Sequence, residues 1–141
     1  MNGINRREIY KRVVLGFVFF WFCFGSLAHF LFTRAEVRIV PTYIPFHRLD
    51  VYASGVLEMV GAIGLLFRRT RSWAGFGLFL LTIAVTPANI HMAVHWRSYP
   101  EVSPWVLNAR LVFQVFFLAG IWWSTGLQKY YTQFIKGNMN W

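Results

Sequence analysis

The sequence predicts an all-α membrane protein, a four-transmembrane-helix bundle that forms a single domain over residues 1–141. Hydrophobic residues make up 57% of the chain and charged residues 13%, whereas soluble domains carry about 25% charged residues. Four apolar runs each come close to the ~20 residues that a helix needs to cross a ~30 Å hydrocarbon core. Because backbone groups in a bilayer must be satisfied within their own segment, such runs predict helices.

The basic residues cluster between these runs, and the spans are expected at about residues 13–32, 49–67, 73–94 and 104–126. Nine of the fourteen Lys and Arg residues lie on the side of the two chain ends, namely Arg6, Arg7, Lys11, Arg12, Arg68, Arg69, Arg71, Lys129 and Lys136. The other five are Arg34, Arg38, Arg48, Arg97 and Arg110. Since cytoplasmic loops carry an excess of Lys and Arg, both termini are expected on the cytoplasmic side of an inner (plasma) membrane.

The formal net charge of +9 suits the anionic headgroups of a lipid bilayer. No basic surface interleaved with exposed aromatic residues lies outside the apolar runs, so no nucleic acid partner is expected. The lone cysteine, Cys23, lies inside the first span. It cannot form an intrachain disulfide, and a buried small hydrophobe is the better interpretation.

The loop after the first span, residues 33–48, is too apolar for a solvated connection. It reads TRAEVRIVPTYIPFHR, and Pro41 and Pro45 prevent a regular helix from running through them. We expect a re-entrant or interfacial segment on the outer membrane surface that covers the end of the bundle. Two roles remain open for it, a lid over a site and a plain interfacial anchor.

Polar residues inside the spans are the strongest functional signal, because ionisable groups there are costly and mark functional sites by default. Glu58 lies near the middle of the second span, so its carboxylate must be paired, hydrogen-bonded or protonated. Arg110 in the fourth span needs an anion, and Asp50 and Glu58 are the only carboxylates within the spans. The expected ligand-binding or structural cluster comprises His29, Asp50, Glu58, Asn89, Arg110 and Gln114.

Depth along each helix, at about 1.5 Å per residue, sorts the polar residues into two layers of the outer half. The outer layer holds His29, Asn89 and Arg110, and the deeper layer holds Glu58 and Gln114. The sequence therefore predicts a polar pocket that opens outward beneath residues 33–48. The inner half offers apolar side chains and glycines suited to close helix packing, namely Gly16, Gly64, Gly75 and Gly77.

His91 and His95 have the i, i+4 spacing that a metal site uses. No cysteine and no carboxylate lies in step with them, so no metal site is expected. Two interfacial histidines are the favoured interpretation. Haem is disfavoured as well, although His29 or His91 could serve as an axial ligand.

The sequence resembles the DoxX-like family of small four-span membrane proteins. The likeness covers roughly residues 13–125 and rests on GSLAHF, VPTYIP, SGVLEMVGAIGLL, AVTPANIHMAV and the step from Arg110 to Gln114. It implies a left-handed four-helix membrane bundle. It also implies that the family's typical polar positions are His29, Glu58, Pro87, Asn89, Arg110 and Gln114.

The resemblance implies no single activity. Its relatives include a subunit tied to thiosulfate oxidation with quinone as acceptor, and proteins associated with methylamine-dehydrogenase maturation or oxidative-stress complexes. Eukaryotic relatives are cargo receptors or assembly chaperones. Because this chain lacks cysteine pairs, a maturation role based on disulfides is not expected for it.

Several functions remain open, and no catalytic residue is assigned. An accessory, assembly or interaction subunit, with a membrane-protein partner or as a homo-oligomer, predicts a closed interior with Arg110 touching Glu58. A redox-associated subunit that binds a quinone-like lipophilic ligand predicts a pocket of several hundred Å³ reaching Glu58. A transporter or proton path is disfavoured, because the inner half lacks polar residues to continue the path.

Overall fold

The computed structural model describes residues 5–100, 102–129, 131 and 132. Its helices, in chain order, are α1 (Arg6–Leu31), α2 (Thr33–Ile39), α3 (His47–Leu66), α4 (Arg71–Val94), the short 3₁₀ helix η1 (Trp96–Ser98) and α5 (Pro104–Thr125). No strand occurs within these described ranges. Lys136, one of the nine basic residues on the side of the chain ends, lies outside the described residues.

Four of these helices, α1, α3, α4 and α5, are long and apolar enough to cross a membrane. This finding confirms the all-α class and the four candidate spans, with ends that differ from the expected ones by a few residues. The largest difference is at Arg6, where α1 begins, because the Asn5 side chain accepts a hydrogen bond from the Arg7 backbone N–H at 3.1 Å and caps the helix. At the other end of the chain, Gly126 adopts a left-handed conformation with φ 80° and ends α5.

Residues 33–48 are more ordered than an extended loop. The segment begins with the seven-residue helix α2, which ends at Ile39, before Pro41. Its last two residues already belong to α3, which starts at His47 after a left-handed Phe46. No helix runs through Pro41 or Pro45, and α2 packs against α1 and α3.

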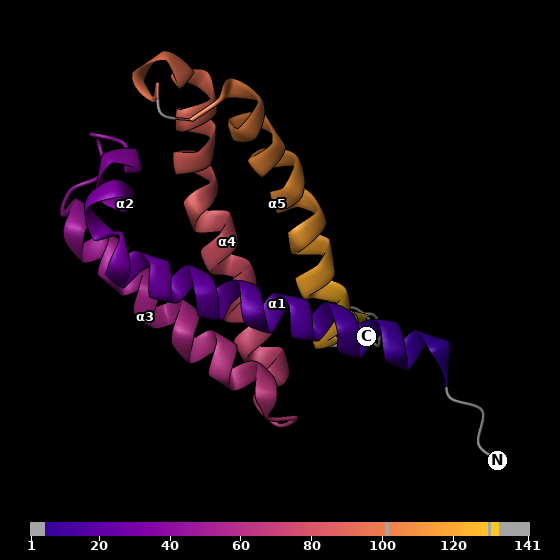
Figure 1. Cartoon of the computed structure of the whole chain (residues 1–141). Coiled ribbons are helices and arrows are strands. Elements are labelled where there is room, and N and C mark those ends of the chain that lie inside the picture. The colour runs from indigo at the N-terminus through magenta and orange to yellow at the C-terminus, as the bar shows by residue number, and fades with distance from the viewer. Residues whose placement is uncertain (1–4, 101, 130, 133–141) are drawn as a thin grey trace, which may run out of the picture.

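The long helices form two antiparallel pairs (Figure 1). α1 packs most extensively against α3, and α4 packs against both α5 and α3. α1 also crosses α5, but the two helices spread apart toward the end of the bundle that carries α2 and η1 (Figure 1). We call that end the α2 end. The opposite end, with the start of α1, the turn from α3 to α4 and the end of α5, is the Arg68 end.

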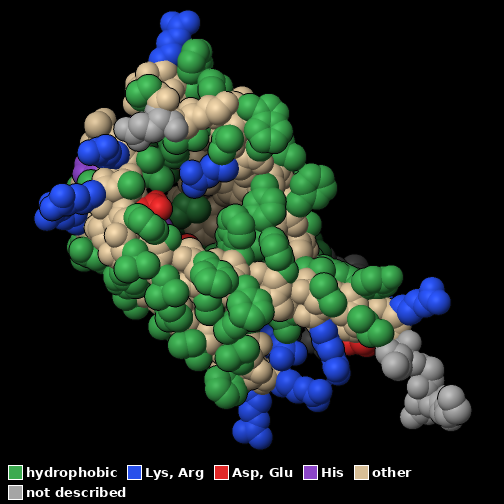
Figure 2. Space-filling view, in the orientation of Figure 1, with side chains coloured by type: hydrophobic (Ala, Val, Ile, Leu, Met, Phe, Trp, Pro, Cys, Tyr) green, Lys and Arg blue, Asp and Glu red, His purple; other side chains and the backbone are tan. Residues whose placement is uncertain are grey.

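The buried core lies where the helix pairs cross. Its members are Val18, Phe22, Ala62, Leu65, Leu78, Phe117 and Ile121. The outer surface is also apolar: Trp73, Trp105 and Phe116 each keep more than 70% of their surface exposed. Figure 2 shows hydrophobic side chains across the middle of one face and most of its basic side chains at the extremities, the pattern expected for contact with lipid chains and headgroups.

Two of the glycines expected to permit close packing do so. A Cβ at Gly64 would lie 2.7 Å from Ala74 Cβ, and a Cβ at Gly75 would lie 2.5 Å from Thr125 Cβ. The expectation is wrong for Gly16 and Gly77, where a Cβ would meet no described atom within 4 Å. The turn between α3 and α4 brings Gly64 against Ala74, whereas Gly16 and Gly77 lie on open helix faces.

We predict that Gly75→Ala lowers the thermal stability of the detergent-purified protein by ~1–3 kcal/mol, because overpacking forces neighbouring atoms to shift. Thr125 cannot easily yield, since its side chain is β-branched and its hydroxyl donates to the Ile121 carbonyl at 2.6 Å. Gly77→Ala in the same helix is the matched control and should be neutral or slightly stabilising. Equal stability of the two variants in a thermal unfolding assay would contradict the packing of α4 against Thr125.

Candidate functional site

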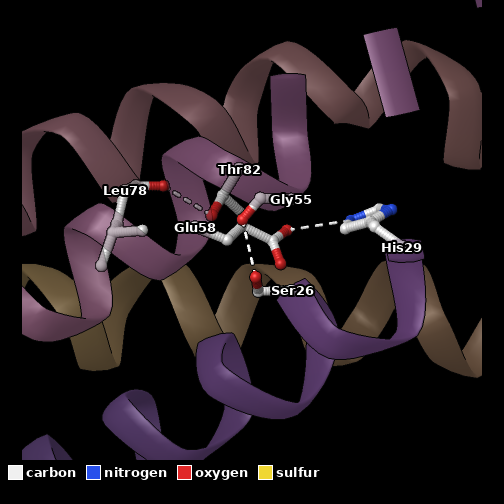
Figure 3. Close-up of polar contacts among 6 residues, drawn as sticks. All are labelled: Ser26, His29, Gly55, Glu58, Leu78 and Thr82. Atoms are coloured by element: carbon white, nitrogen blue, oxygen red, sulfur yellow. Dashed lines mark hydrogen bonds and ion pairs between the residues drawn. The ribbon is translucent and has the colours of Figure 1, made fainter. Parts of the chain in front are cut away.

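The first polar cluster joins α1 to α3. His29 Nε2 on α1 lies 3.4 Å from Glu58 Oε1 on α3, so that the ring N–H donates to the carboxylate. Figure 3 shows the two side chains pointing toward each other between the helices. Only 18% of the His29 side chain and 13% of the Glu58 side chain remain exposed. The pair is therefore largely shielded from its surroundings. Glu58 lies near the middle of α3.

Small residues allow α1 and α3 to approach closely enough for this pair. A Cβ at Gly25 would lie 2.8 Å from Glu58 Oε2, and one at Gly55 would lie 3.0 Å from His29 Cβ. Ser26, between these contacts, donates its hydroxyl to the Gly55 carbonyl at 2.7 Å (Figure 3). Small residues with a crossing hydroxyl are a common way to join helices inside a membrane.

The His29–Glu58 pair does not satisfy all its own polar atoms. His29 Nδ1 and Glu58 Oε2 are buried and have no hydrogen-bond partner within the described part of the chain. Asp50 Oδ2, two turns before Glu58 on α3, is in the same condition. A buried polar atom without a partner carries a desolvation cost, and such an atom in a native structure calls for an explanation such as a ligand or a water.

The second polar cluster joins α4 to α5 and is complete. Buried Gln114 on α5 donates to the Thr82 carbonyl at 2.8 Å and to the Thr86 hydroxyl, while its Oε1 accepts from Asn89 Nδ2 at 2.8 Å. Thr86 in turn donates to the Thr82 carbonyl at 3.0 Å. Every polar atom of the Gln114 side chain therefore has a partner, so that this cluster acts as an internal connection between two helices.

The structure thus pairs residues across the two expected layers rather than within them. His29 bonds with Glu58, and Asn89 bonds with Gln114. The site predicted from the sequence did not include Ser26, Thr82 or Thr86, although positions 82, 86 and 89 share one helix face and positions 26 and 29 share another.

Arg110 does not join either cluster. Its side chain is exposed, and it forms no ion pair with Asp50 or Glu58 in the structure as described. The direct contact between Arg110 and Glu58 that a closed interior requires is therefore not formed. The reason is the spread of α5 away from α1 toward the α2 end (Figure 1), which separates the first turns of α5 from α3.

The divergence of α5 from α1 also leaves a hollow on one face of the protein. Figure 2 shows this face hollowed between the α1–α3 side and α5, with acidic and basic side chains at its rim. A groove of about 460 Å³ near the start of α3 is lined by Val37, Phe46, His47, Arg48 and Leu49, and Glu58 is not part of its wall.

The histidines at the end of α4 form a stack. The rings of His91 and His95 lie 4.2 Å apart between centroids, and His95 Nδ1 donates to the His91 carbonyl at 3.0 Å. The Tyr43 ring meets His91 edge-on at 6.3 Å, which brings the segment after α2 against α4. No group of three or more His, Cys, Asp or Glu residues that could hold a metal ion occurs among the described residues.

Comparison with known proteins relates the chain to a protein family. A family model described as a domain of unknown function, DUF8561, matches residues 19–125. The matched region contains every residue of both polar clusters. No curated protein and no solved structure gives a significant match to the chain.

We predict that Gln114→Leu destabilises the protein by ~1–3 kcal/mol, since hydrogen bonds between membrane helices contribute about 0.6 kcal/mol each and Asn89 loses its acceptor. Asn108→Leu on the same helix is the matched control. The Asn108 amide is exposed, and among the described residues it bonds to the Pro104 carbonyl of its own helix alone, so that its loss should cost less than about 0.5 kcal/mol. Thermal unfolding of both variants in one detergent tests this difference, and a similar loss in both would contradict the connecting role of Gln114.

Proposed function

The chain belongs to the DUF8561 family, and we propose that it is a membrane protein that binds a small lipophilic ligand with a hydrogen-bonding head. The observation that carries this proposal is the incomplete hydrogen bonding of the His29–Glu58 pair. The two unpartnered atoms of this pair, His29 Nδ1 and Glu58 Oε2, lie between two helices that are apolar enough to cross a membrane. A ligand head that bonds to His29 Nδ1 and Glu58 Oε2 would complete the pair.

The chemistry of the two atoms favours a quinone-like head. With its Nε2–H donated to Glu58, a neutral His29 ring presents Nδ1 as an acceptor, and a protonated ring presents it as a donor. Likewise, the free Glu58 oxygen accepts a hydrogen bond when the carboxylate is charged and can donate one when it is protonated. A quinone carbonyl needs a donor and a quinol hydroxyl needs an acceptor, so this pair can serve either form of such a ligand.

The apolar body of the ligand would lie in the hollow between the helix pairs. Aromatic side chains of α1 and α5 meet where those helices cross, with Trp21 and Phe113 at 4.8 Å and Trp21 and Phe117 at 5.5 Å between centroids. Such rings offer the flat apolar contacts that ligand pockets commonly use. The resemblance to DoxX-like proteins, some of which are linked to quinone chemistry, is part of the same proposal.

The ligand test compares the gently purified wild-type protein with Glu58→Gln and His29→Phe. We expect a small lipophilic molecule to co-purify with the wild type, and its occupancy to fall about tenfold or more in each variant, because each loses a hydrogen bond to a buried polar group. Native mass spectrometry with analysis of the extracted lipids measures the occupancy. Gly25→Ala adds a third variant, since its Cβ would displace Glu58 Oε2.

Glu8→Gln is the matched control for Glu58→Gln, because it removes the same charge from an exposed position at the other end of the bundle. It should retain the ligand at the wild-type level. A wild-type protein without ligand, or a ligand held equally by Glu58→Gln, would overturn the proposal.

A second candidate is an accessory or assembly subunit that works with a membrane-protein partner or as a homo-oligomer. The complete Gln114 cluster favours it, because a satisfied polar network serves to fix one packing of helices. The same experiment separates the two candidates. An accessory subunit would purify without a ligand, and the His29 and Glu58 variants would lose stability or a partner instead.

We further propose that both chain ends face the cytoplasm across an inner membrane, with α2 on the outer surface. Lys and Arg residues are concentrated at the Arg68 end, which supports this orientation. The His29–Glu58 pair would then be reached from the outer half of the bilayer, with α2 above it. The short turn at 67–70, with Arg68 and Arg69, is the strongest element of the charge bias.

The orientation predicts the behaviour of reporter fusions. A fluorescent protein that folds only in the cytoplasm should be bright when fused after residue 129, and dark when inserted between η1 and α5. An alkaline phosphatase reporter, active only outside the cytoplasm, should give the reverse result at both positions. Two fusions with the opposite pattern would invert the proposed topology.

A further inference from the structure

A groove at the Arg68 end combines a basic rim with an apolar wall. It has a volume of about 370 Å³ and lies between α1 and the turn from α3 to α4. Three of the residues that line it are arginines, Arg12, Arg68 and Arg71. Figure 2 shows basic side chains gathered over the lower edge of the visible face, toward this end of the bundle.

No carboxylate of the described residues neutralises the three arginines. None of them forms a salt bridge in the described part of the protein. Arg71 is fixed by a hydrogen bond from its Nε to the Leu65 carbonyl at 2.9 Å, which leaves its terminal nitrogens available. Glu8 is the one carboxylate among the described residues of this end, so the rim keeps a strong positive charge that calls for an anion.

The wall of the groove matches a lipid chain rather than a free ion. Leu15 and Phe19 of α1 and Leu66 of α3 line it, and all three belong to helices that can cross a membrane. Gly16 also lines the groove, and a Cβ at that position would meet no described atom within 4 Å. The open space beside Gly16 therefore continues from the charged rim along the apolar face of α1.

We propose that this groove binds one anionic phospholipid, with its phosphate on Arg12, Arg68 and Arg71 and an acyl chain along Leu15, Gly16 and Phe19. Guanidinium groups bind phosphate through paired N–H donors, and basic pockets between membrane helices bind acidic headgroups. The site lies at the opposite end of the spans from the α2 end, so its failure would leave the proposed ligand at His29 and Glu58 untouched.

The first experiment measures retention of a phosphatidylglycerol by the full chain in neutral detergent, beside a phosphatidylcholine with the same acyl chains. Native mass spectrometry counts the bound lipid. We expect the wild type to retain the phosphatidylglycerol selectively, and Arg12→Gln and Arg68→Gln each to lower its affinity about fivefold, as expected for one basic group near an anionic headgroup. Lys11→Gln and Arg69→Gln are the matched controls, because they remove the same charge next to each position without lining the groove.

The second experiment blocks the groove without changing its charge. Gly16→Leu places a side chain in open space inside the groove and should abolish selective retention, whereas Gly77→Leu places one on an equally open face of α4 and should retain it. Thermal unfolding establishes that each variant is folded. If Gly16→Leu does not fold, the arginine variants and their controls alone test whether the groove binds the lipid.

Three outcomes would overturn the inference. Equal loss in Arg69→Gln and Arg68→Gln would show attraction by overall charge, and full retention by folded Gly16→Leu would place the lipid elsewhere. Displacement of the lipid by excess inorganic phosphate would show a site for a free anion. Selective retention that depends on Arg12, Arg68 and Gly16, and that survives inorganic phosphate, would establish the lipid site.

Discussion

The close approach of α1 to α3 is the contact on which the candidate site depends. Gly25 and Gly55 each lack a Cβ that would collide with the facing helix, and the Ser26 hydroxyl joins the two backbones through the Gly55 carbonyl. Without this approach, His29 and Glu58 could not meet within an apolar span. Because the bilayer offers no water to either group, each must use the other or a bound molecule. The close packing of α1 against α3 is therefore also what brings the polar groups of the site together.

The two polar clusters differ in a way that bears on function. The Gln114 cluster has a partner for every polar atom of its central amide, whereas the His29–Glu58 pair keeps one free atom on each residue. A protein that needed polar contacts only for packing would gain from completing both. The incomplete bonding of the His29–Glu58 pair is the feature that favours a ligand over a purely internal role.

Much of the fold could be predicted from the sequence, because long apolar runs interrupted by basic turns leave few alternatives to membrane helices. The polar residues His29, Glu58 and Gln114 stood out for the same reason. Their partners did not, since residue number gives depth along a helix but not the angle at which two helices cross. Arg110 lies apart from Glu58 because α5 diverges. Gln114 bonds to the backbone carbonyl of Thr82 and to the hydroxyl of Thr86, and residue type does not reveal a bond to a backbone carbonyl. The tight α1–α3 contact depends on which glycine faces which helix, and spacing alone does not specify that.

The length of α3 implies a preferred bilayer thickness. α3 has 20 residues and α1 has 26, which at 1.5 Å per residue correspond to about 30 Å and about 39 Å. The first seven residues of α1 include four basic side chains, so the apolar part of α1 is about as long as α3 and neither helix has spare length. The Ser26–Gly55 hydrogen bond joins the two helices. A thicker, sterol-rich membrane would therefore draw the ends of α3 into hydrocarbon or thin the lipid around it. Hydrophobic mismatch would favour residence in a bilayer of ordinary or low thickness.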